Sequence, residues 1–123
     1  MKIEFANQKI FNRAHIHGWS SQLTSVVLWL PTIMDTIVVT SAWRPVKIHG
    51  GDSGIHTRTP LRALDLRSRI YSNPQKIADE INDYWIYDPA RTHYKVCFYH
   101  TTGRGFHYHL QVHPSTTIRN NHA

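Results

Sequence analysis

The segment His107-Tyr108-His109 places two imidazoles close together in an apolar run. In a strand, residues two apart point to the same face and are separated by about 6.5 Å. Two imidazoles on one face can serve one site, where one binds a metal ion and the other reaches the water that the metal carries. The pattern alone is weak evidence, because His15-Ile16-His17 repeats it in a polar segment that we expect to be solvated.

His56 and Asp65 form the second candidate group. His56 ends the segment Ser53-Gly54-Ile55-His56 in a polar loop, and Asp65 lies inside the apolar stretch 61–66. A carboxylate is costly to bury unless it is paired or binds a metal ion. An ion pair with Arg62 or Arg67 would explain Asp65 equally well.

Arg44 stands just past a run of β-branched residues, 36–41, that predicts a buried strand. An arginine at such a point can bind a carboxylate through its forked guanidinium, or it can be a surface charge that covers the loop. Trp43, beside Arg44, and Ser53, at the other end of the loop, are candidates for contacts with a substrate.

The elements that must position these residues are helices and short strands. Ser20 predicts the start of a helix that Pro31 ends, and Asn73-Pro74 predicts the start of another that carries Ile77, Ile81 and Trp85 on one apolar stripe. Strands are predicted at 36–41, 61–67, 95–100 and 106–112, with a loop at 44–59 and a hairpin loop at 101–105. We expect an α+β fold with a small antiparallel sheet and two or three helices packed on it.

Composition limits the class of protein. The 123 residues fit one domain, 1–123, and a hydrophobic fraction of 41% argues against a disordered chain. The ten histidines outnumber the eight acidic residues. The single cysteine, Cys97, excludes an internal disulfide and a cysteine-based zinc knuckle, and its apolar surroundings predict a core position. The net charge of +6 favours attraction to nucleic acid or to anionic cell-wall polymers.

The order of the motifs resembles one known family. Ser41-Ala42-Trp43-Arg44, then Ser53 to His56, then Arg62-Ala63-Leu64-Asp65-Leu66-Arg67, then His107-Tyr108-His109-Leu110-Gln111-Val112, is similar to the zinc D-alanyl-D-alanine carboxypeptidases and phage endolysin peptidases of peptidase family M15. The resemblance covers about residues 20 to 113. It implies a hedgehog/DD-peptidase-like fold with the zinc site at the sheet.

The resemblance also implies roles. His56, Asp65 and His109 would bind Zn²⁺, His107 would act on the catalytic water, and Arg44 would bind and polarise the substrate. Two imidazoles and one carboxylate leave the fourth tetrahedral position open for water, as in catalytic zinc sites. The substrate would be the stem peptide of bacterial peptidoglycan, cleaved by a D,D-carboxypeptidase or an L-alanyl-D-glutamate endopeptidase.

The sequence departs from the family pattern in two places. The family spaces its histidine and aspartate by six residues, with a glycine between them, whereas eight residues and no glycine separate His56 from Asp65. We expect the additional residues to loop out near Pro60, which favours a turn. No Glu-x-x-His precedes His109, so the general base is assigned to His107, with His100 across the hairpin as the alternative.

Two other functions compete with the peptidase. A nickase of the HUH type also carries His-hydrophobic-His on a strand, but it has its nucleophilic tyrosine after that motif, and no tyrosine follows Tyr108. A non-catalytic basic binding domain would explain the charge but not the order of the motifs. We therefore expect no nucleic-acid partner, a monomer, and, because no signal peptide or membrane-length apolar run is visible, a cytoplasmic protein that is not inserted in a membrane. A phage enzyme would stay in the host cytoplasm until its release to the cell wall.

Overall fold

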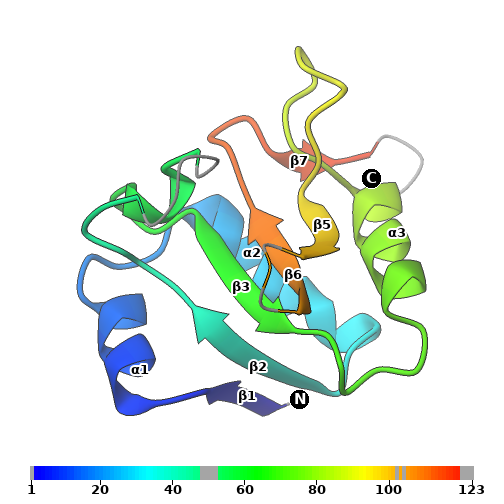
Figure 1. Ribbon diagram of the computed structural model, residues 1–123. Helices are drawn as coiled ribbons and strands as arrows, with labels where there is room; N and C mark the ends of the chain where they lie inside the picture. The colour runs from blue at the N-terminus through cyan, green and yellow to red at the C-terminus, as the bar shows by residue number, and fades with distance from the viewer. Residues whose placement is uncertain (1, 48–52, 102, 104, 120–123) are drawn as a thin grey trace.

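A five-stranded sheet forms the centre of the protein (Figure 1). The structure is a computed structural model that describes residues 2–47, 53–101, 103 and 105–119. In the sheet order β1-β2-β3-β6-β5, only the β1–β2 pair is parallel. The strands are β1 (Lys2–Phe5), β2 (Thr36–Ser41), β3 (Ala63–Arg67), β5 (Cys97–Thr101) and β6 (Phe106–Gln111). The α+β class and the antiparallel pairing of the last strands are confirmed, and the parallel edge strand β1 was not predicted.

Three α-helices accompany the sheet. They are α1 (Gln8–His15), α2 (Ser21–Trp29) and α3 (Pro74–Tyr84). The predicted caps are present, because the side chains of Ser20 and Asn73 accept hydrogen bonds from the backbone at the starts of α2 and α3. In Figure 1, α2 lies behind the sheet, α3 lies beside β5, and α1 lies near β1 at the other edge. None of the helices in the described residues has the length and apolar character needed to cross a membrane.

The alternation of side chains along β3 and β6 separates the core from the site. Leu64, Leu66, Tyr108 and Leu110 are at most 1% exposed and belong to the hydrophobic core. Burying each of these side chains contributes about 1.5–3 kcal/mol. The residues between them point to the opposite face, where Asp65 pairs in register with His109. The core therefore fixes which side chains the site face displays.

The β5–β6 hairpin is held against α3 by polar contacts. The Asn82 side chain accepts from the backbone N–H of Cys97 at 2.9 Å and donates to its carbonyl at 2.7 Å. The Tyr108 hydroxyl donates to the carbonyl of Pro74 at 2.9 Å. Cys97 is 1% exposed, which confirms the predicted core position, and burial raises the pKa of its thiol. These contacts fix β6, and with it His107 and His109.

Trp85 is placed differently from the prediction. Helix α3 ends at Tyr84, and Trp85 begins β4 (Trp85–Ile86), which pairs with β7 (Thr117–Ile118). The side chain still enters the core, at 7% exposed. The prediction of a helical stripe was wrong at this position because pairing with a distant segment replaces the last helical turn.

Candidate metal centre

Three of the predicted residues converge on the face of the sheet opposite Leu64, Leu66, Tyr108 and Leu110. One ligand atom from each of His56, Asp65 and His109 lies within 4.8 Å of the others. They come from the short 3₁₀-helix η2 (Ile55–Thr57), from β3 and from β6. Between η2 and β3 the chain bends at Thr59 and Pro60, where we expected the additional residues to loop out, and it returns so that the side chains of His56 and Asp65 meet.

The spacing of the ligand atoms suits a tetrahedral ion. Asp65 Oδ1 lies 3.2 Å from His56 Nε2 and 3.1 Å from His109 Nδ1. Ligands bound to zinc at about 2.0–2.1 Å in a tetrahedron are separated by about 3.3 Å. Two of the three distances match this value, while the two histidine nitrogens lie within 4.8 Å of each other and would have to approach by up to about 1.5 Å to bind one ion.

Neighbouring carbonyl groups fix which ring nitrogens carry hydrogen. His56 Nδ1 donates to the carbonyl of Ala42 at 2.8 Å, since a carbonyl can only accept. Gln111 donates its amide N–H to the carbonyl of Lys95 at 2.9 Å, so its oxygen faces His109 and accepts from Nε2, also at 2.9 Å. His56 therefore donates through Nδ1 and His109 through Nε2. We call these two atoms the outer nitrogens, and the two that contact Asp65 the inner nitrogens.

The inner nitrogens, His56 Nε2 and His109 Nδ1, both face Asp65 Oδ1. If both rings are neutral, the two inner nitrogens and Asp65 Oδ1 direct lone pairs at a common point, and these lone pairs repel each other unless a cation lies between them. That cation is either a metal ion or the extra protons of two imidazolium rings. Outer partners that fix the histidine tautomer in this way are characteristic of metal sites.

The electrostatics of Asp65 agree with this description. Burial opposes its ionisation, but hydrogen bonds from His109 and His56 outweigh burial and hold the pKa of Asp65 well below its usual range. Arg44 Nη1 lies 3.9 Å from Asp65 Oδ2. Neither Arg62 nor Arg67 is among the ion-pair partners of Asp65 in the described residues, so the predicted alternative for Asp65 is not found.

The two candidates for the general base lie beside the group. His107 Nε2 is 3.9 Å from Asp65 Oδ1, and its side chain is 19% exposed. The ring of His100, on β5, lies 4.8 Å from the ring of His107. Burial, together with the charges of His107 and His109, lowers the pKa of His100. Both imidazoles therefore lie beside the three-residue group.

The three other predicted residues have different positions. Arg44 lies at the group, where it donates to Ser41 Oγ at 2.9 Å, and its backbone N–H donates to the carbonyl of His56, also at 2.9 Å. Trp43 is partly buried, with its ring 4.5 Å from that of His17. Ser53 does not reach the three-residue group; it lines a neighbouring pocket. The exposure predicted for His15 and His17 is confirmed.

Gln111 is the functional residue that the sequence reasoning missed. It is 8% exposed and connects His109 to the backbone of Lys95. Its position two residues after His109 on the same strand would have been the signal, because it places a polar side chain on the metal face.

Comparisons with known proteins gave no relatives: no family model, no curated protein and no solved structure matches this chain. Only the fold and the arrangement of the site therefore indicate what kind of protein this is. The protein is an α+β domain in which Asp65 and His109 of the sheet and His56 of η2 form a group that could hold a metal ion.

Proposed function

We propose that the protein is a zinc-dependent peptidase that hydrolyses a peptide bond in the stem peptide of bacterial peptidoglycan, in phage lysis or in remodelling of the cell wall. The observation that carries the proposal is the convergence of His56, Asp65 and His109, with both outer ring nitrogens held by acceptors. The order of the motifs supports the M15 type of peptidase and a hedgehog/DD-peptidase-like arrangement.

His56 Nε2, Asp65 Oδ1 and His109 Nδ1 would hold the zinc ion. Zinc bound there supplies a Lewis acid and lowers the pKa of a water molecule towards about 7. Asp65 would balance part of the charge of the ion, and the positive charge of the ion would favour the ionised form of Asp65. Two neutral ligands and one anionic ligand leave a position for substrate, as catalytic zinc sites require.

His107 would act as the general base and acid. Its Nε2 lies on the same face as the ligands, 3.9 Å from Asp65 Oδ1, without being part of the three-residue group. From there it can take a proton from water and return it to the leaving amine, a contribution of about 10²–10⁴-fold. The ring of His100 lies 4.8 Å from the ring of His107, and burial lowers the pKa of His100.

Arg44 would bind the substrate carbonyl and the negative charge that develops on it. Ser41 Oγ and the His56 carbonyl hold the side chain and backbone of Arg44, which reduces the reorganisation needed during the reaction. Arg44 Nη1 lies 3.9 Å from Asp65 Oδ2, beside the residues that would hold the zinc ion.

Digestion of purified peptidoglycan, with mass spectrometry of the fragments, tests the proposal. The zinc-loaded protein should release alanine or stem-peptide fragments, and His109→Ala should abolish the release and the bound zinc together. His15→Ala, which changes an exposed histidine in α1, serves as the matched control and should keep both. Cleavage of single-stranded DNA with Mn²⁺, and no release from peptidoglycan, would instead identify a nickase.

A further inference from the structure

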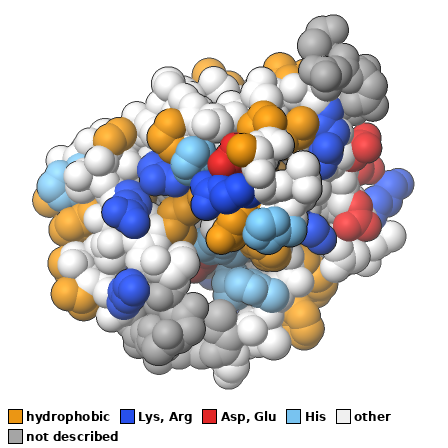
Figure 2. Space-filling view, turned by 90° about the horizontal axis from the view of Figure 1, so that it is seen from above, with side chains coloured by type: hydrophobic (Ala, Val, Ile, Leu, Met, Phe, Trp, Pro, Cys, Tyr) orange, Lys and Arg blue, Asp and Glu red, His pale blue; other side chains and the backbone are white. Residues whose placement is uncertain are grey.

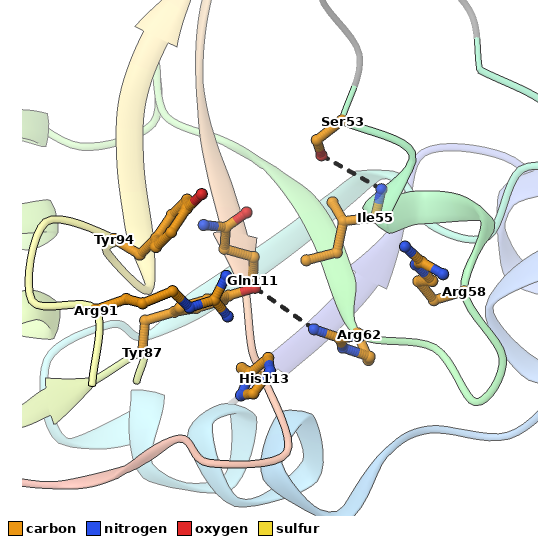
Figure 3. A pocket seen from close by; sticks show the side chains of 9 residues that line it. All are labelled: Ser53, Ile55, Arg58, Arg62, Tyr87, Arg91, Tyr94, Gln111 and His113. Carbon is orange, nitrogen blue, oxygen red and sulfur yellow. Dashed lines mark hydrogen bonds between the residues drawn. The ribbon is translucent and has the colours of Figure 1, made fainter. Parts of the chain in front are cut away.

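Nine described residues line a pocket of about 430 Å³, and Figure 3 shows their side chains. Gln111, which holds His109, and Ile55, which precedes His56, contribute to its lining and connect it to the centre. The side chains that give the pocket its chemical character are basic or aromatic: Arg58, Arg62, Arg91, His113, Tyr87 and Tyr94.

The pocket carries more positive than negative charge. None of the described residues that line it is acidic. Arg62 donates to neutral acceptors, the Val112 carbonyl at 3.0 Å and the Tyr87 hydroxyl at 3.4 Å. Arg58 is exposed and has no ion pair among the described residues. In Figure 2, blue Lys and Arg side chains and pale blue His side chains gather near the middle of one face of the molecule.

Asp88 neutralises only part of this charge. Asp88 accepts from Arg91 Nε at 2.8 Å and lies 4.0 Å from His113 Nδ1. The guanidinium of Arg91 also lies over the ring of Tyr94, 4.6 Å from its centroid. Arg91 is thus held in place, whereas the charges of Arg58 and Arg62 are available to an anion.

We propose that this pocket binds a carboxylate of the peptide substrate, within about two residues of the bond that is cut; the proposal rests on the proposed function. Gln111 follows His109 by two residues on β6, a distance of about 6.5 Å. One residue of an extended peptide spans about 3.3–3.6 Å. A substrate that crosses the centre along β6 therefore brings a carboxylate one or two residues away to the arginines. Their planar guanidinium groups match a carboxylate.

Titration of the zinc-loaded protein with glutarate, followed by nuclear magnetic resonance of the backbone amides, tests the pocket without any bond to cleave. Glutarate should shift the signals of Tyr94 and His113, and the neutral diamide of glutarate should not. Arg58→Gln should weaken glutarate binding about fivefold or more, since one charge-assisted hydrogen bond is lost. Arg69→Gln removes an exposed arginine that does not line the pocket, and it should leave binding unchanged. Equal binding of the diamide, shifts confined to His56 and His109, or equal losses in the two variants would overturn the proposal.

The kinetics separate this proposal from the proposed function. For a synthetic stem peptide, converting its carboxylates to amides should raise KM about fivefold or more in the wild-type protein and have a smaller effect in Arg58→Gln. Cleavage of both peptides with equal KM would refute the carboxylate pocket and leave the peptidase standing. Glutarate shifts at the pocket, with no cleavage of any peptide, would refute the peptidase and leave a carboxylate-binding pocket.

Discussion

Gln111→Met would test the link between the metal centre and its support. Methionine keeps a side chain of similar length but cannot accept from His109 Nε2 or donate to the Lys95 carbonyl, which Gln111 contacts at 2.9 Å each. The His109 ring then loses the partner that fixes its tautomer and orientation. Losing such an outer partner typically costs about 10–100-fold in metal affinity. We expect a loss of zinc affinity in that range.

The same change should also reduce stability. Gln111 is 8% exposed, so the Lys95 carbonyl and the His109 N–H lose a partner where water has little access. One buried group without a partner costs about 1–3 kcal/mol. The free energy of unfolding of the metal-free protein, measured in urea, should fall by at least that amount.

Gln111→Glu separates the two contacts. Glutamate still accepts from His109 but cannot donate to the Lys95 carbonyl, so it should destabilise the protein while keeping most of the zinc affinity. Competition with a chromogenic zinc chelator measures the affinity of both variants. If Gln111→Met binds zinc as tightly as the wild-type protein does, the reasoning that Gln111 positions His109 is refuted.

Three further changes test other parts of the site and fold. His107→Gln should lower kcat of peptide hydrolysis by about 10²–10⁴-fold with zinc content unchanged, and a loss of zinc would make His107 a ligand instead. In the metal-free protein the pKa of Asp65 is depressed. The free energy of unfolding should therefore be higher in the wild-type protein than in Asp65→Asn at pH values above about 4, the pKa of Asp65 in the unfolded chain. This difference should disappear as the pH falls towards the lower pKa of the folded state. Urea unfolding at several pH values measures this, and a difference that grows below pH 4 would contradict it. Tyr108→Phe removes the hydrogen bond to Pro74 and should cost about 0.5–1.5 kcal/mol in thermal unfolding, whereas no change would show that this bond does not hold the hairpin.

The local elements could be predicted because their signals are local. Ser20 and Asn73 are caps whose side chains accept from backbone groups a few residues away, and alternation along 106–111 assigns Tyr108 to the core and His109 to the site face. These patterns depend on periodicity and capping, which short stretches of sequence contain.

The remaining elements depend on contacts between distant parts of the chain. Trp85 fits a helical stripe by its spacing, but its pairing with Ile118 makes it extended. Strand β1, Lys2-Ile3-Glu4-Phe5, alternates polar and apolar residues, but it is exposed along most of its length, and its parallel pairing with β2 places it in the sheet. Such pairing is decided by tertiary packing and not by propensity.

The residues that converge could be predicted from the sequence, whereas the groups that support them could not. His56, Asp65, His109, His107 and Arg44 could be named because imidazole, carboxylate and guanidinium groups are the side chains that metal and carbonyl chemistry requires. The backbone carbonyls that accept from the histidines, and the basic pocket beside them, arise only when separate segments meet.

Zinc K-edge X-ray absorption of the metal-loaded protein tests the central claim most directly. The claim predicts one zinc ion per chain with four ligands, two imidazole nitrogens and two oxygens, at about 2.0–2.2 Å. In His109→Ala the spectrum should lose one imidazole. A six-coordinate shell of oxygen alone, or a spectrum that His109→Ala leaves unchanged, would contradict the claim that His56, Asp65 and His109 bind one ion.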